Sequence, residues 1–572
     1  MKIALQRSPR GLSELLRRHP YLFTFLICAV LLPFGFADRA LITAGSCVYL
    51  GVVAAAAAVA AVFLFKLGKT LYESIILCVI CVSGITACMM IIALVQNKTL
   101  AISIIALIVA VTAALFIKAT FGISDTAIIA LLIFLGITIR FVYVLYTGSI
   151  DRQHDVGFFN WNWGHANYIE YWYNNPFKLP DFDIRTKWQY YHPPLHHWLM
   201  AVLLRLLTWL GVKYETAAES LQMLPMLYSC LTVIVSYRIF RLVKLKGKPL
   251  FAAVAIMCFH PTFILFAGSF NNDMLLTLFV MAAIMWGLRW YRVPKMKNII
   301  PLALCIGLGM MTKLSGWMVA PAVAALFLIV LIKNIRKPIY TIVQYTVFLI
   351  ISVPLGIWWQ VRNLLRFNVP LTYIQGLGTE VTFYLGNMSV TERLFDFSGQ
   401  QLTYIYDAFL SYGAPYDEYN PTLGLFKTAM FDEGTNNICD ANFPQISVTA
   451  PILYILSIVL FLVCFVCFIC AVVRKSKYIN CGAERLYFAL LFAVYLGCYY
   501  WFCFAYPYTC TMNIRYCMPL IPLCAMGLAL VLQSTKDNKK PVAVWFRRVM
   551  YAVTAAFCAM SYLVYTQVGM TQ

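Results

Sequence analysis

Long apolar runs alternate with short polar segments along almost the whole chain. A membrane-spanning helix needs about 20 mostly apolar residues, because its backbone must satisfy its own hydrogen bonds in hydrocarbon. Fifteen runs fit this description, and they predict an all-α, polytopic membrane protein. The predicted spans lie near residues 21–36, 41–65, 72–95, 99–117, 124–146, 221–242, 249–267, 274–291, 298–312, 317–333, 339–358, 449–473, 486–506, 514–534 and 547–566.

Two long polar stretches interrupt this pattern, at residues 147–220 and 360–446. The first contains one further apolar run, 195–211, which is short for a span and carries Arg205. Binding and catalytic residues are often found in loops that a rigid scaffold holds in place. We therefore look for chemistry in these two stretches.

The composition agrees with the apolar pattern. Hydrophobic residues make up 62% of the 572 residues, charged residues make up 12%, and the mean hydropathy is +0.78. A soluble globular protein carries roughly 25% charged residues, so a water-soluble enzyme is excluded. The net charge of +21 fits a cytoplasmic bias of lysine and arginine, and we expect no nucleic-acid partner.

The distribution of charges predicts one orientation. The N-terminal segment 1–20 carries five basic residues and one acidic residue, which places it in the cytoplasm. Alternation from there puts 18 of the 23 acidic residues, and both long polar stretches, outside the cytoplasm. Counting 195–211 as a span would move the basic group 238–248 outside, so we expect an amphipathic helix in the outer interface instead.

The first outer loop, 147–220, carries most of the candidate chemistry. It holds five of the seven histidines, several carboxylates and a dense aromatic cluster. Asp151 and Asp155 lie just beyond the span 124–146, at the level of lipid phosphates. A carboxylate there can act as a general base toward a hydroxyl or amine, an effect of about 10²–10⁴-fold. The alternative is that both acids are merely solvated at a membrane end.

The histidines of this loop offer a metal site as a second hypothesis. His192, His196 and His197 have helix-like spacing, and three histidines near carboxylates are compatible with zinc or manganese. Because an HxxxH pattern alone is weak, interfacial anchoring and hydrogen bonding are favoured. No cofactor is assigned, and a divalent metal stays open.

The motifs of the loop and of later segments follow an order that resembles a known family. After Asp155 come GHANYIEY and the box WQYYHPPLHHWL, followed by GSFNNDMLL, GLGMMTKLSGW, VRNLLRFNVPL and NIRYCMPLIP. This order is similar to that of the protein O-mannosyltransferases and the bacterial lipid A aminoarabinose transferases. Both are membrane enzymes of glycosyltransferase family 39 with the GT-C fold. Val156 stands where the mannosyltransferases have Glu, so the resemblance favours a broader bacterial member of the family.

The resemblance implies a fold, a location and an activity. The fold would be GT-C, with about 15 transmembrane helices and two large extracytoplasmic loops, in a bacterial plasma membrane. The activity would be sugar transfer from a polyprenyl-phosphate donor to an extracytoplasmic protein, lipid or envelope glycan, with inversion at the anomeric carbon. Asp155 is the implied general base, with Asp151 second.

The resemblance also implies groups that bind the departing phosphate and the substrates. Guanidinium and ammonium groups suit a phosphate, and the candidates are Lys313, Arg362, Arg515 and Arg140. Arg140 lies inside a span, where a charge costs about 2.5–3.5 kcal/mol unless it has a role or snorkels to the interface. The substrate-binding candidates are His165, His192, Asn272, Asp273 and Tyr191. The structural alternatives are loop shaping for His192, helix capping for the Asn-Asp pair, and an interfacial belt for the aromatics.

The same pattern suggests a division of the chain. Residues 1–20 form the cytoplasmic N-terminus, 21–123 an additional four-helix membrane module, and 124–566 the GT-C-like membrane core. The expected partners are the lipid-linked donor, the acceptor and membrane lipid. A transporter or flippase for a lipid-linked sugar is the alternative, as is a non-catalytic scaffold. Polar residues concentrated in outer loops favour surface chemistry over transport.

Overall fold

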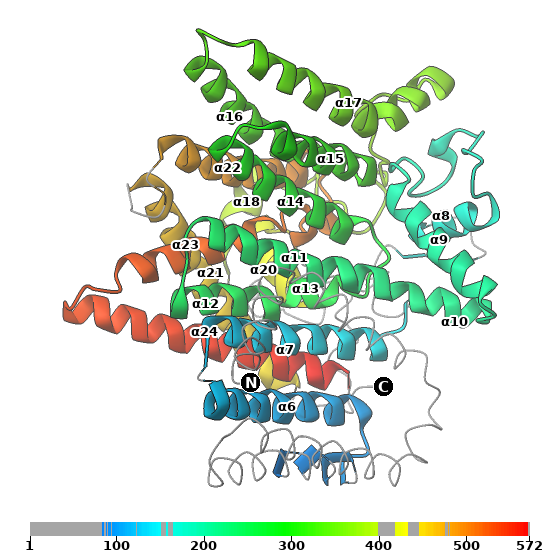
Figure 1. Cartoon of the computed structure of the whole chain (residues 1–572). Helices are drawn as coiled ribbons and strands as arrows, with labels where there is room; N and C mark the ends of the chain where they lie inside the picture. Colours follow the sequence, from blue (N-terminus) through cyan, green and yellow to red (C-terminus); the bar gives the residue numbers. More distant parts are fainter. Residues whose placement is uncertain are drawn as a thin grey trace, which may run out of the picture. The chain divides into compact units, whose positions relative to one another are not determined.

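The computed structural model of the chain is built from helices (Figure 1). It describes residues 98–569, apart from 122, 150–155, 158, 160–163, 399–417, 433–445, 475–478 and 480, together with most positions from 83 to 97. Among these residues the strand-like pairing is a single isolated bridge between Tyr384 and Tyr508. The predicted all-α class is confirmed.

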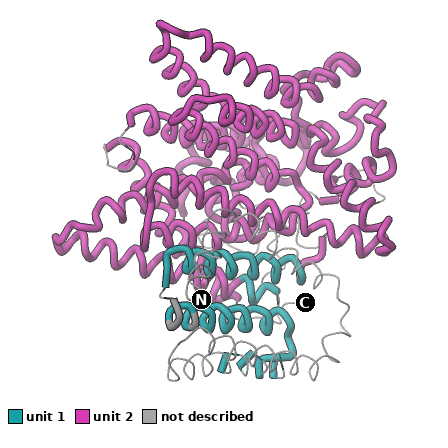
Figure 2. The backbone as a smooth tube through the Cα atoms, viewed as in Figure 1, with its two compact units in different colours: residues 1–146, 565–572 teal, residues 147–564 magenta. Residues whose placement is uncertain are grey.

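The chain forms two compact units (Figure 2), which are described separately here. Residues 1–146 and 565–572 make the first unit, and residues 147–564 make the second. In the first unit, α6 (Lys98–Phe121) packs against α7 (Asp125–Tyr146). The added module predicted at 21–123 lies largely outside the described residues and stays a prediction.

In the described part of the chain, nine helices are long and apolar enough to cross a membrane, which makes this a multi-pass membrane protein. Three shorter apolar helices are α12 (Gly247–Phe259), α15 (Met296–Thr312) and α23 (Leu520–Ser534). The long spans comprise α6, α7, α11 (Met223–Leu242), α14 (Asp273–Arg292), α16 (Ala320–Lys333) with the turn before it, α17 (Ile339–Phe367), α21 (Ile446–Val473), α22 (Gly482–Ala505) and α24 (Pro541–Val568). The predicted spans 21–36 and 41–65, and most of 72–95, lie outside the described residues, so the count of fifteen stays a prediction.

Two predicted spans are shorter in the structure than the apolar pattern suggests. The run 249–267 is divided into α12 and α13 (Pro261–Leu265), because Pro261 has no amide hydrogen and keeps His260 extended. The run 514–534 begins with the short turn η6 (Ile514–Tyr516), and α23 starts only at Leu520. Residues 513–519 are therefore mostly irregular, which lets Arg515 take part in a site rather than in a helix.

The first outer loop contains the predicted amphipathic helix. α8 (Gly164–Asn174) packs on α9 (Leu195–Trp209), which covers most of the run 195–211. One face of α9 is buried and carries His196, His197, Met200, Ala201, Leu204 and Leu207. The other face exposes Val202, Leu206 and Trp209, followed by Leu210. The helix and its two faces are confirmed, and its place in the membrane interface stays a prediction.

The central helices of the second unit bring one end of several spans together. α14 packs against α11 and α15, α15 packs against α17, and α12 and α21 both pack against α23. A bidentate ion pair joins α14 to α22, with Arg292 Nε 2.7 Å and Arg292 Nη2 2.9 Å from the Glu484 carboxylate oxygens. Because α14 and α15 form an antiparallel pair with a short connection, the first residue of α14 lies beside the residue that follows α15.

Candidate active site

A buried ion pair marks the point where α14 begins and α15 ends. Lys313 Nζ lies 2.6 Å from Asp273 Oδ1, and the two side chains are 14% and 2% exposed. Asp273 is the first residue of α14, where a negative charge interacts favourably with the helix dipole. Both residues were predicted from sequence for separate roles, and the structure places them in contact.

The two asparagines before Asp273 make different hydrogen bonds, and only one of them caps the helix. Asn271 Oδ1 accepts a hydrogen bond from the Asp273 amide at 3.2 Å, as a capping side chain does. Asn272 occupies the N-cap position without capping, and its Nδ2 donates instead to Thr312 O at 3.0 Å. The capping alternative therefore applies to Asn271 and does not apply to Asn272.

Three consecutive side chains at this helix start keep buried polar atoms without a partner among the described residues. These atoms are Asn271 Nδ2, Asn272 Oδ1 and Asp273 Oδ2. Most buried polar atoms in proteins are hydrogen-bonded, so such a cluster is unusual in a purely structural helix start. It is the pattern expected where a ligand or bound water completes the hydrogen bonding.

The Arg515 segment reaches the same place from the other end of the chain. Asn513 Oδ1 accepts from the Arg515 amide at 2.9 Å and shapes η6. The Arg515 guanidinium lies 4.9 Å from the centre of the Tyr516 ring, and Lys313 Nζ lies 5.2 Å from the same ring. Asp273, Arg515 and Tyr516 line one cleft of about 340 Å³. The structure thus brings Asp273, Lys313 and Arg515 together.

The helix α20 (Pro421–Phe431), within the polar stretch 360–446, fixes the position of η6. The Ile514 amide donates to Thr428 Oγ1 of α20 at 2.9 Å. Asn513 Nδ2 donates to Asp432 Oδ1, just beyond α20, at 3.0 Å. The helix α20 and Asp432 therefore orient the segment that carries Arg515.

A buried ion pair joins Glu418, just before α20, to Lys427 within the helix. Glu418 and Lys427 bond to each other, and their side chains are 3% and 2% exposed. Burial raises the pKa of Glu418 to about 7, an effect that the Lys427 charge opposes. Glu418 O also accepts a hydrogen bond from Thr509 Oγ1, which links this pair to the chain before η6.

The histidines of the first outer loop form a stacked cluster. His165 Nδ1 lies 2.7 Å from His197 Nε2, and the two rings are stacked with centres 5.0 Å apart. The His192 ring stacks on His165 from 6.0 Å. Burial, together with the neighbouring imidazoles, holds the pKa of His197 well below its usual range. His197 is therefore a neutral ring near pH 7.

His196 connects this cluster to the start of α14. Its Nε2 donates to Phe270 O at 2.8 Å, directly before the Asn-Asn-Asp segment. Burial lowers the pKa of His196 to about 4, although Phe270 O and the Asp273 carboxylate act in the opposite direction. This hydrogen bond joins helix α9 to the segment that precedes Asp273.

The predicted catalytic carboxylates, Asp151 and Asp155, lie outside the described residues. The chain directly after Asp155 is described and is tied to the start of α8. Val156 O accepts a hydrogen bond from the Ala166 amide at 2.8 Å. A Cβ on Gly164 would lie 2.6 Å from Val156 O, so this approach requires glycine. The segment that follows the predicted base is therefore anchored beside His165.

Two further candidates, Tyr191 and Arg362, both contact Trp359. The Tyr191 ring is 4.1 Å from the His192 ring, and Tyr191 O accepts from Trp359 Nε1 at 3.2 Å. The Arg362 guanidinium lies 5.0 Å from the Trp359 ring and donates to Asn363 Oδ1 at 2.7 Å. Arg362 also donates to Pro180 O. Its contacts tie α17 to the first outer loop, whereas Arg515 and Asp273 line the cleft.

Arg140 belongs to the first unit. Its side chain is 1% exposed, and Nη1 donates to Gly136 O at 2.7 Å. The guanidinium is therefore buried in the protein rather than extended to water.

The metal hypothesis gains no support from the described part of the chain. There, no group of three or more His, Cys, Asp or Glu residues is placed to hold a metal ion. His165 and His197 bond to each other, and His196 bonds to a backbone carbonyl. No metal-binding role is assigned to these histidines.

Several cleft residues were not among the sequence candidates. Tyr495 of α22, Tyr516 and Ser315 line the cleft with Asp273. Tyr495 belongs to a stripe of buried tyrosines, Tyr487, Tyr495 and Tyr499, spaced eight and four residues apart. This spacing is visible in the sequence and indicates one buried helix face.

One family model matches the middle of the chain. Residues 191–358 match the model described as dolichyl-phosphate-mannose-protein mannosyltransferase. The matched segment holds Tyr191, His192, Asp273 and Lys313, and the resemblance seen in the sequence is confirmed over these residues. No curated protein matches the chain in sequence.

The chain is similar to several solved structures. ArnT from Cupriavidus metallidurans, bound to undecaprenyl phosphate, is 14% identical with a TM-score of 0.42, over 78% of this chain and 77% of ArnT. The oligosaccharyltransferase AglB from Archaeoglobus fulgidus, in complex with an inhibitory peptide and a dolichol-phosphate, is 13% identical with a TM-score of 0.39, over 77% of this chain. The apo form of the Archaeoglobus fulgidus oligosaccharyltransferase is 12% identical with a TM-score of 0.38, over 83% of this chain. The chain spans 55% and 56% of the length of these two oligosaccharyltransferase chains.

Proposed function

We propose that this chain is a membrane glycosyltransferase that moves a sugar from a polyprenyl-phosphate donor to an acceptor outside the cytoplasm. The observation that carries the proposal is that Asp273 and Arg515 line one cleft and that Lys313 pairs with Asp273 beside it. These residues are far apart in sequence, and each stands in a motif that resembles the same family. The family-model match includes the first two of them.

The cations at the cleft suit a departing lipid phosphate. Arg515 offers a planar fork that matches phosphate oxygens, and Lys313 adds a second positive charge at the same aromatic ring. Asp273 pairs with Lys313 at 2.6 Å, and Arg515 lines the same cleft as Asp273. An anionic headgroup can accept charge-assisted hydrogen bonds from these cations.

Asp155 is the proposed general base. Its carboxylate takes the proton from an acceptor hydroxyl or amine as the acceptor atom bonds to the anomeric carbon of the sugar. The bond between that carbon and the phosphate oxygen breaks, polyprenyl phosphate leaves with the electron pair, and the anomeric configuration is inverted. Anchoring of Val156 to the start of α8 supports a fixed position for this segment beside the histidine cluster. Asp151 is the second choice for the base.

The remaining candidates take supporting roles in this proposal. His165 and His192 stack on each other in the segment that follows Asp155 in sequence, and Tyr191 packs on His192, so we assign these three a shaping role. Arg362 holds the first outer loop against α17, and Asn272 orients the Lys313 segment through Thr312 O. We place the site on the outer side of a bacterial plasma membrane, with the N-terminus in the cytoplasm.

Transfer of label tests the function. The purified protein in lipid vesicles is given a panel of labelled polyprenyl-phosphate sugars and cell-envelope acceptors, in parallel with Asp155→Asn and Asp151→Asn. We expect the wild type to form a labelled product and Asp155→Asn to be slower by about 10²–10⁴-fold. Equal rates for wild type and Asp155→Asn would move the base elsewhere, first to Asp151. Movement of labelled lipid across the vesicle membrane without any product would contradict the transferase function and favour the flippase function.

A further inference from the structure

The cleft beside Asp273 contains more polar groups than a phosphate site needs. It is formed by α14, the turn η3 (Leu314–Val319), α22 and the segment around η6, and it encloses about 340 Å³. Its polar lining residues are Asp273, Thr277, Ser315, Tyr495, Arg515 and Tyr516.

Two of these polar groups are buried and have no hydrogen-bond partner within the described residues. They are Asp273 Oδ2, whose companion oxygen is held by Lys313, and the hydroxyl of Tyr495. Thr277 differs from them, since its hydroxyl donates to Asp273 O at 2.8 Å within the helix. Buried polar atoms without partners are costly, so they indicate a ligand that supplies the missing bonds.

The chemistry of the two unsatisfied groups selects the ligand. A carboxylate oxygen only accepts hydrogen bonds, and a phenol both donates and accepts them. A phosphate offers acceptors and negative charge, so it would be repelled by Asp273. A sugar hydroxyl, or the ammonium group of an amino sugar, donates to the carboxylate and pairs with the phenol. The unsatisfied groups therefore fit a sugar better than a phosphate.

The Tyr516 ring also lines this cleft, and it packs against Phe502 with ring centres 4.7 Å apart. The C–H groups on one face of a pyranose ring pack well against an aromatic ring. Arg515 and Lys313 lie near the same ring, at 4.9 and 5.2 Å from its centre. The cleft thus has an aromatic ring and two hydrogen-bonding groups for a sugar. The cations near the same ring suit the phosphate to which that sugar is joined.

We propose that this cleft holds the sugar ring of the lipid-linked donor. Tyr516 is the platform, Tyr495 and Asp273 bind ring hydroxyls or an amino group, and Arg515 faces the adjoining phosphate. Tyr495 is the specificity residue that this assignment adds. The inference rests on the proposed function, and it names the part of the donor that each side of the cleft recognises.

Removal of the single oxygen of Tyr495 tests the assignment. Tyr495→Phe keeps the ring and the packing of α22. Tyr500→Phe is a matched control on the same helix, because the Tyr500 hydroxyl pairs with Thr422 Oγ1 at 2.8 Å and does not line the cleft. Dissociation constants are measured for a polyprenyl-phosphate sugar that the wild type uses and for bare polyprenyl phosphate, and Michaelis constants are measured for donor and acceptor.

We expect Tyr495→Phe to weaken binding of the sugar-bearing donor by about threefold to tenfold, the usual effect of one lost hydrogen bond. Binding of bare polyprenyl phosphate stays unchanged in that variant, and Tyr500→Phe changes neither ligand. Equal losses for both lipids, or an unchanged affinity for the donor, would overturn the assignment. So would a raised Michaelis constant for the acceptor alone, which would place the acceptor in the cleft.

The failure of the proposed function has a different signature. A folded wild type that binds no polyprenyl-phosphate lipid and transfers no sugar contradicts the function, and it removes the inference with it. A wild type that transfers sugar while Tyr495→Phe behaves like Tyr500→Phe contradicts the inference alone.

Discussion

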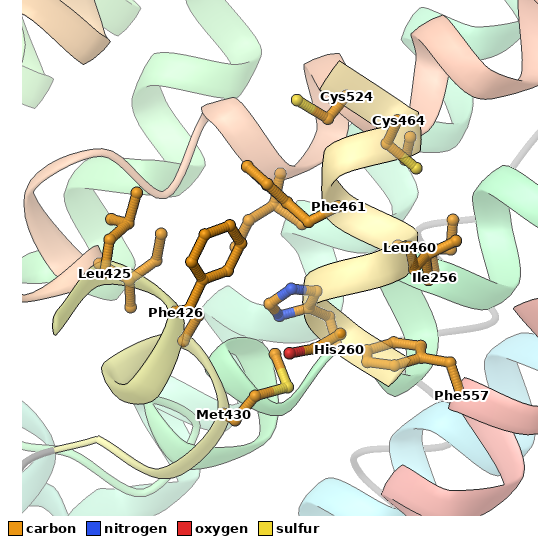
Figure 3. Close-up of a pocket in the computed structure, with 15 residues that line it drawn as sticks. Ile256, His260, Leu425, Phe426, Met430, Leu460, Phe461, Cys464, Cys524 and Phe557 are labelled. Carbon is orange, nitrogen blue, oxygen red and sulfur yellow. The ribbon is translucent and has the colours of Figure 1, made fainter. Parts of the chain in front are cut away.

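Two cavities of the second unit differ in chemistry more than in size. The polar cleft encloses about 340 Å³ beside Asp273, whereas the apolar cavity of Figure 3 encloses about 500 Å³ between α12, α20, α21, α23 and α24. Two consecutive residues line different cavities, because Ile514 lines the apolar cavity and Arg515 lines the cleft. The polar groups that suit a ligand line the smaller of the two, the cleft.

The difference lies in how the polar atoms are used. His260 projects into the apolar cavity among aromatic and aliphatic side chains (Figure 3). Its Nδ1 accepts a hydrogen bond from the Thr262 amide at 3.3 Å. That ring serves the turn between α12 and α13. In the cleft, by contrast, Asp273 Oδ2 and the Tyr495 hydroxyl are unsatisfied within the described residues. Unsatisfied buried polar atoms therefore identify the candidate site better than volume does.

The largest expected effect comes from breaking the ion pair at the cleft. Lys313→Met leaves the Asp273 carboxylate, 2% exposed, without its partner, and should lower the free energy of unfolding by about 3–5 kcal/mol. Thermal or denaturant unfolding in detergent measures the loss. The double variant Lys313→Met with Asp273→Asn removes both charges and should recover most of it. A Lys313→Met protein as stable as the wild type would show that the pair is not needed to hold the cleft.

A pH-dependent effect is expected next to the cleft, at His196. The pKa of His196 in the folded protein, about 4, lies below its ordinary value of 6.5. Above pH 6.5 the ring is neutral in both states, whereas between pH 6.5 and 4 the unfolded chain binds the proton more tightly. The free energy of unfolding therefore falls as the pH decreases from 6.5 toward 4. The loss amounts to about 3 kcal/mol. His196→Gln keeps a donor for Phe270 O and should flatten the fall in unfolding free energy between pH 6.5 and 4. The titratable groups near His196 are His197, Tyr228 and, through charge, Asp273. An unchanged pH slope in His196→Gln would contradict this origin.

Arg515 should show the cleft's preference for an anionic headgroup. Arg515→Gln removes a charge-assisted hydrogen bond, so we expect binding of bare polyprenyl phosphate to weaken by about 1.5–3 kcal/mol. The affinity of the wild type should also fall at higher salt, and that of the variant should depend less on salt. Titration calorimetry in detergent measures both. Equal affinities of the two proteins at low salt would place the phosphate away from Arg515.

The smallest effect is expected in the apolar cavity. Ala525→Val adds two methyl groups to its lining and should change the free energy of unfolding by less than about 1 kcal/mol. The rate of sugar transfer should not change, because Ala525 does not line the cleft. A large loss of transfer in a folded Ala525→Val protein would give the apolar cavity a part in the reaction and blur the contrast between the two.

Sequence patterns revealed the features that depend on neighbouring residues. Apolar runs gave the long spans, since a helix in lipid must be apolar over its whole length. The alternation of faces in 195–211 gave α9 correctly, with His196 and His197 on its buried side. Motif order pointed to Asp273 and Lys313, which the structure joins at 2.6 Å.

Features that depend on distant contacts were not visible in the same way. The division of 249–267 at His260 follows from Pro261, a signal present in the sequence but outweighed by hydropathy. Tyr495 resembled any tyrosine of an apolar span, because the absence of a partner for its hydroxyl is a property of the folded chain. Arg362 shared its motif context with the other cations, yet it contacts Pro180 O instead of lining the cleft.

The most direct measurement is an electron cryomicroscopy structure with a non-hydrolysable polyprenyl-phosphate sugar bound. We expect phosphate oxygens within hydrogen-bonding distance of the Arg515 guanidinium and the sugar ring against Tyr516, beside Tyr495 and Asp273. A headgroup bound in the apolar cavity of Figure 3, or at any place remote from both Arg515 and Lys313, would contradict the assignment of the cleft as the donor site.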